Sequence, residues 1–348
     1  MMNPARRIAV LRWSALILLC GCDLAGAQSV ESFYRGKQIT LLVGSGAGGG
    51  YDVYARTFAR HFSKHIPAQP AVVVKNMPAA GGMAAANTLY NQSDKEGLTL
   101  AAHTNGIAMD PLLGNAAAKF DGRKFNLLGS IGKLQNVCAI WHEHPIKTIE
   151  HARVQEFTAA GAGATSNTVI VPRILNALLG TKIKVIAGYE PGQGDAIAME
   201  SREVDGVCGL AWSTIKASRA HWIKDKKINI LVQMAMDKLP DLPDVPGALE
   251  LVSGENRQIL ELILIRQEMG RPFAAPPGVP ADRVQALRAA FEATLGDGDF
   301  LAEARQAQLE IEPLSGQRID ELLAGAYGAP RAIIDKAAAL LNPPAGEK

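Results

Sequence analysis

The chain has 348 residues, of which 48% are apolar and 20% charged, and its 36 Lys and Arg nearly balance its 34 Asp and Glu. This composition is typical of globular proteins and excludes a disordered, collagen-like or coiled-coil chain. The length predicts two domains. Because no basic cluster of the kind that binds nucleic acid is present, we expect no nucleic-acid partner.

The first 27 residues have the pattern of an export signal. Three arginines precede the apolar stretch 13–20, and Ala25-Gly26-Ala27 provides the small residues of a cleavage site. The apolar stretch is shorter than the about 20 residues that a membrane-spanning helix needs. The pattern therefore predicts a signal peptide over residues 1–27 and a chain exported to the periplasm.

The sequence leaves two alternatives open for Cys22 and two for the pair Cys138 and Cys208. The sequence Leu-Cys-Gly-Cys at residues 19–22 is similar to a lipobox, so lipoprotein anchoring at Cys22 is an alternative to simple cleavage. Beyond the leader Cys138 and Cys208 remain, and in an oxidising compartment such a pair can form a disulfide. Two separately buried thiols are the alternative.

From residue 37 onward, short runs of β-branched residues alternate with helical patterns of apolar spacing. The first strands are expected at residues 39–43, 71–74 and 98–102. A glycine loop at residues 44–50 leads from the first strand into a helix. In that helix apolar residues recur every three or four positions from Tyr51 to Phe62, which marks one buried face.

A second series of the same kind begins near Val137. Its strands are expected at residues 157–160, 184–187, 204–210 and 228–233. A Pro-rich stretch at residues 239–246 follows, and beyond it the pattern is mainly helical, with one extended piece near residues 271–275. Strand, loop and helix in repeated order predict an α/β protein with two mostly parallel sheets flanked by helices.

The loop of residues 44–49, Gly-Ser-Gly-Ala-Gly-Gly, matches the dinucleotide motif G-x-G-x-x-G. A dinucleotide site also needs an acidic residue at the end of the second strand, where this chain has Lys75 and Asn76. Since Lys75 could face a 2′-phosphate, an exported NADP-binding enzyme is the less favoured alternative. We expect no cofactor.

Four strand-to-helix junctions are rich in glycine or small polar residues. They lie at residues 44–52, 76–83, 161–167 and 188–195. Such a junction presents unpaired N–H groups at the positive end of a helix dipole, which favours an anion. Because α/β proteins bind ligands at the carboxyl ends of their strands, the four junctions together predict an anion site. Glycines that only make tight turns are the alternative.

The sequence offers few candidates for catalysis or metal binding. His61 and His65 lie four residues apart on the first helix, lack an acidic partner in the motif and are expected at the surface. His142 and His144 share one face of an extended segment, but no third ligand is close in sequence. We therefore expect no catalytic residue and no metal.

Seven short motifs follow one another along the chain: Tyr34-x-x-Lys37-x-Ile39, Ala47-Gly48-Gly49-x-x-Asp52, Asn76-x-Pro78-x-x-Gly81-Gly82, Glu96-Gly97-Leu98-Thr99-Leu100, Glu203-Val204-Asp205-Gly206, Leu242-Pro243-Asp244-Val245-Pro246 and Pro276-Pro277-Gly278-Val279-Pro280. Their order and spacing resemble those of the periplasmic solute receptors of tripartite tricarboxylate transporters, the Bug family. The resemblance covers residues 33–341.

The resemblance implies a two-lobed, type II-like periplasmic-binding-protein fold with a cleft between the lobes. Residues 28–133 and 233–348 would form the first lobe and residues 134–232 the second. The implied function is a non-catalytic receptor that binds a small organic acid (a di- or tricarboxylate or an aromatic acid) and delivers it to a membrane permease. It is expected to act as a monomer. A periplasmic sensor for a membrane signalling partner is the alternative.

The resemblance also implies which residues line the cleft. Two glycine loops of the first lobe would hold the ligand carboxylate, while a helix start in the second lobe would hold its far end. The implied ligand-binding residues are Ser45, Gly46, Ala47, Gly48, Gly49, Asp52, Pro78, Ala79, Ala80, Gly81, Gly82, Thr104, Asn105, Thr165, Ser166, Asn167, Asp205 and Trp212. We expect specificity to come from oriented N–H and O–H donors rather than from arginines.

Several of these positions carry alternatives. Ala80 stands where the family usually has Gly. Asp52 either caps its own helix or meets an amine of the ligand. Tyr51 and Trp212 either stack on an aromatic acid or pack in the core.

Overall fold

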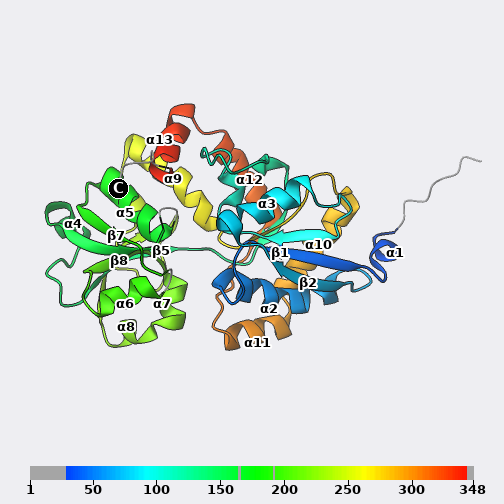
Figure 1. The fold of residues 1–348 in the computed structure, drawn as a ribbon, viewed down its shortest axis with the longest axis horizontal. Helices are drawn as coiled ribbons and strands as arrows, with labels where there is room; N and C mark the ends of the chain where they lie inside the picture. Colours follow the sequence, from blue (N-terminus) through cyan, green and yellow to red (C-terminus); the bar gives the residue numbers. More distant parts are fainter. Residues whose placement is uncertain (1–28, 164–165, 191–192, 343–348) are drawn as a thin grey trace, which may run out of the picture.

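The computed structural model describes residues 29–163, 166–190 and 193–342, in which two β-sheets lie side by side with helices on both faces of each (Figure 1). The predicted signal peptide and Cys22 lie outside these residues. The first sheet has the strand order β11 (Leu314–Ser315), β4 (Asn126–Ser130), β10 (Pro272–Ala275), β3 (Thr99–Ala102), β1 (Gln38–Val43) and β2 (Ala71–Asn76). The second has the order β7 (Ile183–Ala187), β6 (Phe157–Gly161), β8 (Gly206–Ala211), β5 (Asn136–Trp141) and β9 (Ile228–Met234).

Both sheets are mixed. In the first, β1 pairs in parallel with β2 and β3, whereas β10 is antiparallel to β3 and β4, and β11 is antiparallel to β4. In the second, β6 is parallel to β7 and β8, whereas β5 is antiparallel to β8 and β9. Most strands of each sheet therefore run in one direction, as expected, and β5, β10 and β11 run against them.

Strand β1 is buried on both faces of the first sheet. Leu41 and Val43 point to one core, which α2 (Gly50–His65), α10 (Ala281–Leu295) and α11 (Gly298–Gln306) cover. Leu42 points to the other core, which includes α3 (Met83–Asn91) and α12 (Gly316–Tyr327). Because successive side chains of a strand point to opposite faces, a strand buried on both sides reads as a continuous apolar run.

The second sheet is covered in the same way. The helices α4 (Ile149–Val154) and α5 (Asn167–Leu179) pack on the face that carries Cys138 and Ile140. The helices α6 (Gly194–Glu200), α7 (Trp212–Ser218) and α8 (Ala220–Lys224) pack on the face that carries Val137. The short helix α1 (Val30–Tyr34) and the 3-10 turns η1 (Ala79–Gly82), η2 (Ile107–Met109), η3 (Gly122–Lys124) and η4 (Ala248–Leu251) lie in the connections.

Two further helices join the lobes. Helix α9 (Gly254–Glu268) packs against α12 and α13 (Arg331–Leu341), and α13 also packs on α5 of the second sheet (Figure 1). Arg173 of α5 donates a hydrogen bond to the Leu340 carbonyl at 3.3 Å. The end of the described chain thus contacts the second sheet, although the lobe boundaries expected from the sequence group it with the first. No helix among the described residues has the length and apolar character to cross a membrane.

Cys138 and Cys208 occupy directly paired positions on the neighbouring strands β5 and β8, and a disulfide links them. Both residues are fully buried.

Candidate functional site

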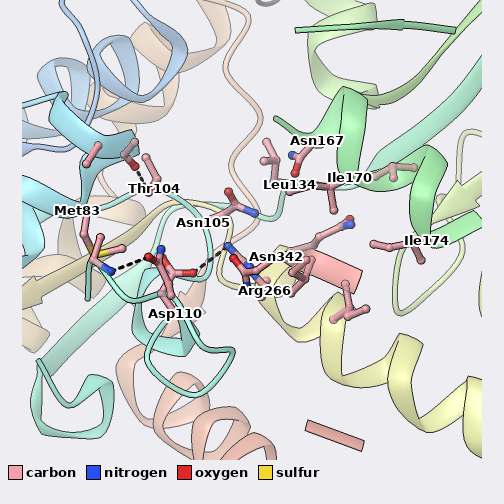
Figure 2. Close-up of a pocket in the computed structure, with 18 of the residues that line it drawn as sticks. Met83, Thr104, Asn105, Asp110, Leu134, Asn167, Ile170, Ile174, Arg266 and Asn342 are labelled. Atoms are coloured by element: carbon pink, nitrogen blue, oxygen red, sulfur yellow. Dashed lines mark hydrogen bonds and ion pairs between the residues drawn. The ribbon is translucent and has the colours of Figure 1, made fainter. Parts of the chain in front are cut away.

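A cleft of about 610 Å³ lies between the two lobes (Figure 2). Its first-lobe wall consists of Tyr51, Ala80, Gly81, Thr104 and Asn105. Its second-lobe wall consists of Asn167, Ile170, Val171 and Ile174 of α5. Its base, which α9 and the segments around it form, consists of Asp110, Asn115, Ile263, Arg266, Gln267, Leu341 and Asn342. Met83, Ala117 and Leu134 complete the lining.

Two loops of the first lobe touch through glycines. Gly82 has φ +92°, and a Cβ at this position would lie 2.7 Å from the Gly44 carbonyl oxygen. Only glycine fits such a combination of backbone and contact. Thr104 links a third loop to these two, because its hydroxyl donates a hydrogen bond to the Gly81 carbonyl at 3.2 Å.

Tyr51 fixes the third loop of the first-lobe wall. The Asn105 backbone N–H donates to the Tyr51 hydroxyl at 3.0 Å, and that hydroxyl donates to Asn105 Oδ1 at 3.2 Å. Burial raises the pKa of Tyr51, so its hydroxyl keeps the proton that it donates. Tyr51 therefore positions Asn105 and lines the cleft at the same time.

Asp52 ties the first glycine loop to its own lobe. Its carboxylate accepts hydrogen bonds from the Gly48 N–H at 2.8 Å, from Arg56 Nε at 2.9 Å and from Asn76 Nδ2 at 2.7 Å. Asn76 Nδ2 also donates to the Ser45 carbonyl at 3.0 Å. Although burial alone raises the pKa of Asp52, these hydrogen bonds bring it below its ordinary value. Asp52 thus holds the loop in place through hydrogen bonds. The sequence analysis had expected it either to cap its helix or to meet an amine of the ligand, and did not anticipate this role.

The loop that Asp52 braces offers free donors. Among the described residues, no partner accepts the backbone N–H of Ser45, Gly46 or Ala47. The loop ends at α2, whose N-cap is Gly49, so these N–H groups lie at the positive end of a helix dipole. This arrangement suits an anion, although the loop lies beside the cleft lining rather than in it.

The second-lobe wall is mainly apolar. Helix α5 begins after Ser166 and turns Ile170, Val171 and Ile174 toward the cleft, with Asn167 at its start. The Ser166 hydroxyl lies 3.0 Å from that of Thr168, which accepts the Ala162 N–H at 3.0 Å. The polar contribution of this wall therefore comes from the first turn of α5.

An ion pair lies at the base of the cleft (Figure 2). A terminal nitrogen of Arg266 lies 3.2 Å from Asp110 Oδ1. Burial raises the pKa of Asp110 above its ordinary value, and Arg266 and a hydrogen bond from Asn115 oppose that rise. The sequence analysis missed this pair and expected no arginine in the site, because no motif surrounds Arg266 and its helix gives no sign of facing a cleft.

Five of the expected site residues line the cleft together: Ala80, Gly81, Thr104, Asn105 and Asn167. The others lie outside its lining: Ser45, Gly46, Ala47, Gly48, Gly49, Asp52, Pro78, Ala79, Gly82, Ser166, Asp205 and Trp212. Thr165 lies outside the described residues.

Two of these residues have other roles. Asp205 precedes β8 and accepts hydrogen bonds from the Thr158 N–H and hydroxyl at 2.7 Å, at the amino-terminal edge of the second sheet. Asn167 lies at the opposite, carboxyl edge. Trp212 is 4% exposed and packs in the second-lobe core, where its Nε1 donates to Asp241 at 2.9 Å.

The expectation that His61 and His65 lie at the surface was wrong for His61, which is 7% exposed. His61 Nε2 lies 2.7 Å from Glu303, and His65 Nε2 lies 2.8 Å from Asp297, both on or next to α11. The hydrogen bond from His65 is the largest cause that lowers the pKa of Asp297 to about 2. The acidic partners come from a distant helix, so a local motif search does not find them.

The family model of the tripartite tricarboxylate transporter family receptor, TctC, matches residues 54–338. A UPF0065 protein in the TAR-I ttuE-ttuC' intergenic region of Agrobacterium vitis is 28% identical over 260 residues, which cover 70% of this chain and 71% of that protein.

Solved structures show the same fold. A TctC solute-binding protein from Polaromonas, without ligand, matches with a TM-score of 0.67 and 20% identity over 87% of this chain and 99% of that one. The periplasmic binding protein BugD matches with a TM-score of 0.60 and 20% identity over 88% and 97% of the two chains. An R. palustris protein with adipate matches with a TM-score of 0.63 and 20% identity over 88% and 98%.

The family match covers most of the chain, and the structural matches confirm the two-lobed fold of periplasmic binding proteins. The alternative of an exported enzyme is thereby set aside. The chain belongs to the TctC, or Bug, family of tripartite tricarboxylate transporter receptors, which are solute-binding proteins and not enzymes.

Proposed function

We propose that this receptor works in the periplasm, where it captures a small organic carboxylate between its lobes and delivers it to the membrane permease of a tripartite tricarboxylate transporter. The observation that carries the proposal is the cleft, in which polar groups of the first lobe face a second-lobe wall that is mainly apolar beyond the start of α5. A ligand with a charged end and a hydrocarbon body matches such a lining.

The proposed binding residues divide by distance from the cleft. Ala80, Gly81, Thr104, Asn105 and Asn167 would contact the ligand directly, since they line the space. The free N–H groups of Ser45, Gly46 and Ala47 would reach the carboxylate through ordered water, because water-mediated hydrogen bonds serve recognition well. The adipate complex of the R. palustris relative supports a carboxylate as the ligand class.

The proposed lobes are residues 28–133 with 233–348, and residues 134–232. The chain passes between the sheets directly after β4 and again after β9, which supports a hinge at these two crossings. Closure about a hinge is the common motion of two-lobed binding proteins. Export to the periplasm follows in this proposal from the leader at residues 1–27.

A thermal-shift screen tests the proposal. The chain from Gln28 onward, purified and refolded to remove bound ligand, is heated with organic acids, with the amide of each acid and with NADP. An acid that raises Tm while its amide does not supports carboxylate capture, because a ligand that binds only the folded state stabilises it. A shift with NADP and none with any acid would contradict the proposal.

Delivery needs its own test. The receptor with bound acid should be retained by membranes that contain the transporter's permease, and less so without the acid. Equal retention with and without the acid would contradict delivery while leaving capture intact.

A further inference from the structure

Arg266 and Asp110 are the charged residues among those that line the cleft in the described part of the chain. The Asp110 side chain is 11% exposed, whereas the Arg266 side chain is 21% exposed and reaches into the cleft (Figure 2). The two meet through one guanidinium nitrogen and one carboxylate oxygen at 3.2 Å. A guanidinium carries five N–H donors, so this single contact leaves most of its hydrogen-bonding capacity unused.

The stem of Arg266 is held in place by a glycine of the first lobe. Gly106 has φ +68°, and a Cβ there would lie 2.7 Å from Cβ, Cγ and Nε of Arg266. The Gly106 N–H also donates to the Met269 carbonyl at 3.4 Å, just beyond the end of α9. Because Gly106 follows Asn105 directly, the same loop presents a wall residue to the cleft and fixes the arginine.

The surroundings of the pair favour an incoming anion. Asn105, Asn115, Gln267 and Asn342 add only neutral polar groups to this part of the cleft. Asp110 has a second partner in Asn115 and is already poorly solvated, which disfavours its charged form. A carboxylate that entered the cleft would meet Arg266 with two oxygens and could form the bidentate geometry that Asp110 does not.

We propose that Arg266 determines specificity by pairing with a second carboxylate at the far end of the ligand, in exchange for its contact with Asp110. The first carboxylate is held by the donors of the first-lobe wall, so this inference rests on the proposed function. The apolar side chains Ile170, Ile174 and Ile263 line the same cleft and would cover the hydrocarbon chain between the two charges. The preferred ligand is therefore a straight-chain dicarboxylate rather than a monocarboxylate.

Calorimetric titration of the refolded chain tests this assignment. The probes are the straight-chain dicarboxylates from four to eight carbons and, for the one that binds best, its mono-amide. The wild-type protein is expected to bind the dicarboxylate about 10- to 100-fold more tightly than the mono-amide, since a charge-assisted pair replaces a neutral contact. In R266Q the dicarboxylate should lose that advantage while mono-amide affinity stays within about threefold.

Three further variants sharpen the result. D110N removes the competing carboxylate and should tighten dicarboxylate binding several-fold. R266K keeps the charge but loses the planar guanidinium, and it should retain part of the preference for the dicarboxylate over the mono-amide. This variant tests the role of Arg266 if R266Q does not fold. R257Q changes an arginine of the same helix that does not line the cleft, and should alter neither affinity.

Equal binding of dicarboxylate and mono-amide by the wild type, or an equal loss of both in R266Q, would overturn the role of Arg266 and leave carboxylate capture standing. Tighter binding of the mono-amide would also overturn it. Absence of binding to any acid would instead contradict the proposed function, and this inference would fall with it.

Discussion

On the first-lobe side of the cleft three loops, two in its lining and one beside it, are fixed by side-chain hydrogen bonds, whereas the second-lobe wall is a helix that presents mainly apolar side chains. Asp52, Tyr51 and Thr104 each hold a loop of the first lobe. In the second lobe the covalent link is buried: the disulfide joins β5 to β8 in the core beneath α5. Polar recognition needs groups that are prearranged, while an apolar cover needs only shape. We infer that the first lobe makes most of the polar contacts that recognise the ligand and that the second lobe mainly covers its apolar part.

The largest expected effect is on the second lobe. Replacing Cys138 and Cys208 with alanine should lower the free energy of unfolding by about 4 kcal/mol, because the disulfide closes a loop with a sequence separation of 70 residues. Urea unfolding with and without reductant measures this, and the double variant should not respond to reductant. Identical unfolding of oxidised and reduced wild type would show that the disulfide does not stabilise the lobe.

The glycine contact of the first lobe gives the next effect. Gly82→Ala should cost about 2–4 kcal/mol and abolish acid binding, since the new Cβ would displace the Gly44 carbonyl. Gly81→Ala is the matched control: Gly81 also has a positive φ, +67°, but its Cβ would meet no atom within 4 Å. It should cost about 1 kcal/mol. Equal losses of stability in the two variants would mean that the loops are not tightly packed.

Asp52 makes the stability of the first lobe depend on pH. Because its pKa is lowered in the folded state, the stability that it contributes is complete above the unfolded value of about 4 and is lost as pH falls through the folded value. Asp52→Asn should cost about 2 kcal/mol at neutral pH and flatten the acid dependence of stability. Urea midpoints between pH 2 and pH 7 measure both. A variant with the same acid dependence as wild type would contradict the bracing role.

The smallest expected effect is at Ala80, where a substitution should increase stability instead of lowering it. Its φ of +52° and ψ of +42° are left-handed, so Ala80→Gly should raise the free energy of unfolding by about 0.5–1 kcal/mol. Ala79→Gly, one residue earlier in a helical conformation, should lower it by about 1 kcal/mol. A thermal melt compares the two. A decrease in both variants would show that Ala80 carries no backbone strain.

Local sequence patterns predicted β1, β2, β3, β6, β7, β8 and β9 and the extended piece at β10, because most of these have a run of apolar, often β-branched residues that needs no distant information. They did not predict β4, β5 or β11. They also located the glycine loops, since residues such as Gly82 are required by the backbone itself. The reversed direction of β5 and β10 could not be read in this way, because strand direction depends on how the chain crosses between lobes.

The base of the cleft was beyond local patterns for a similar reason. Arg266 and Asp110 meet only because α9 returns from the second lobe and packs against the loop that contains Gly106. Trp212 shows the opposite error: an aromatic residue at the end of a strand resembles a ligand-stacking group, yet here it is buried against its own lobe. Tertiary packing decides both cases.

The most direct test of carboxylate capture by both lobes is titration of the best acid into wild type, Asn105→Ala, Asn167→Ala and the control Asn256→Ala. Asn105 and Asn167 face the cleft from opposite lobes, whereas Asn256 is exposed on α9 outside its lining. We predict that each of the first two variants weakens binding about tenfold and that the control matches wild type. Unchanged affinity in Asn167→Ala together with Asn105→Ala would contradict a ligand held between the lobes.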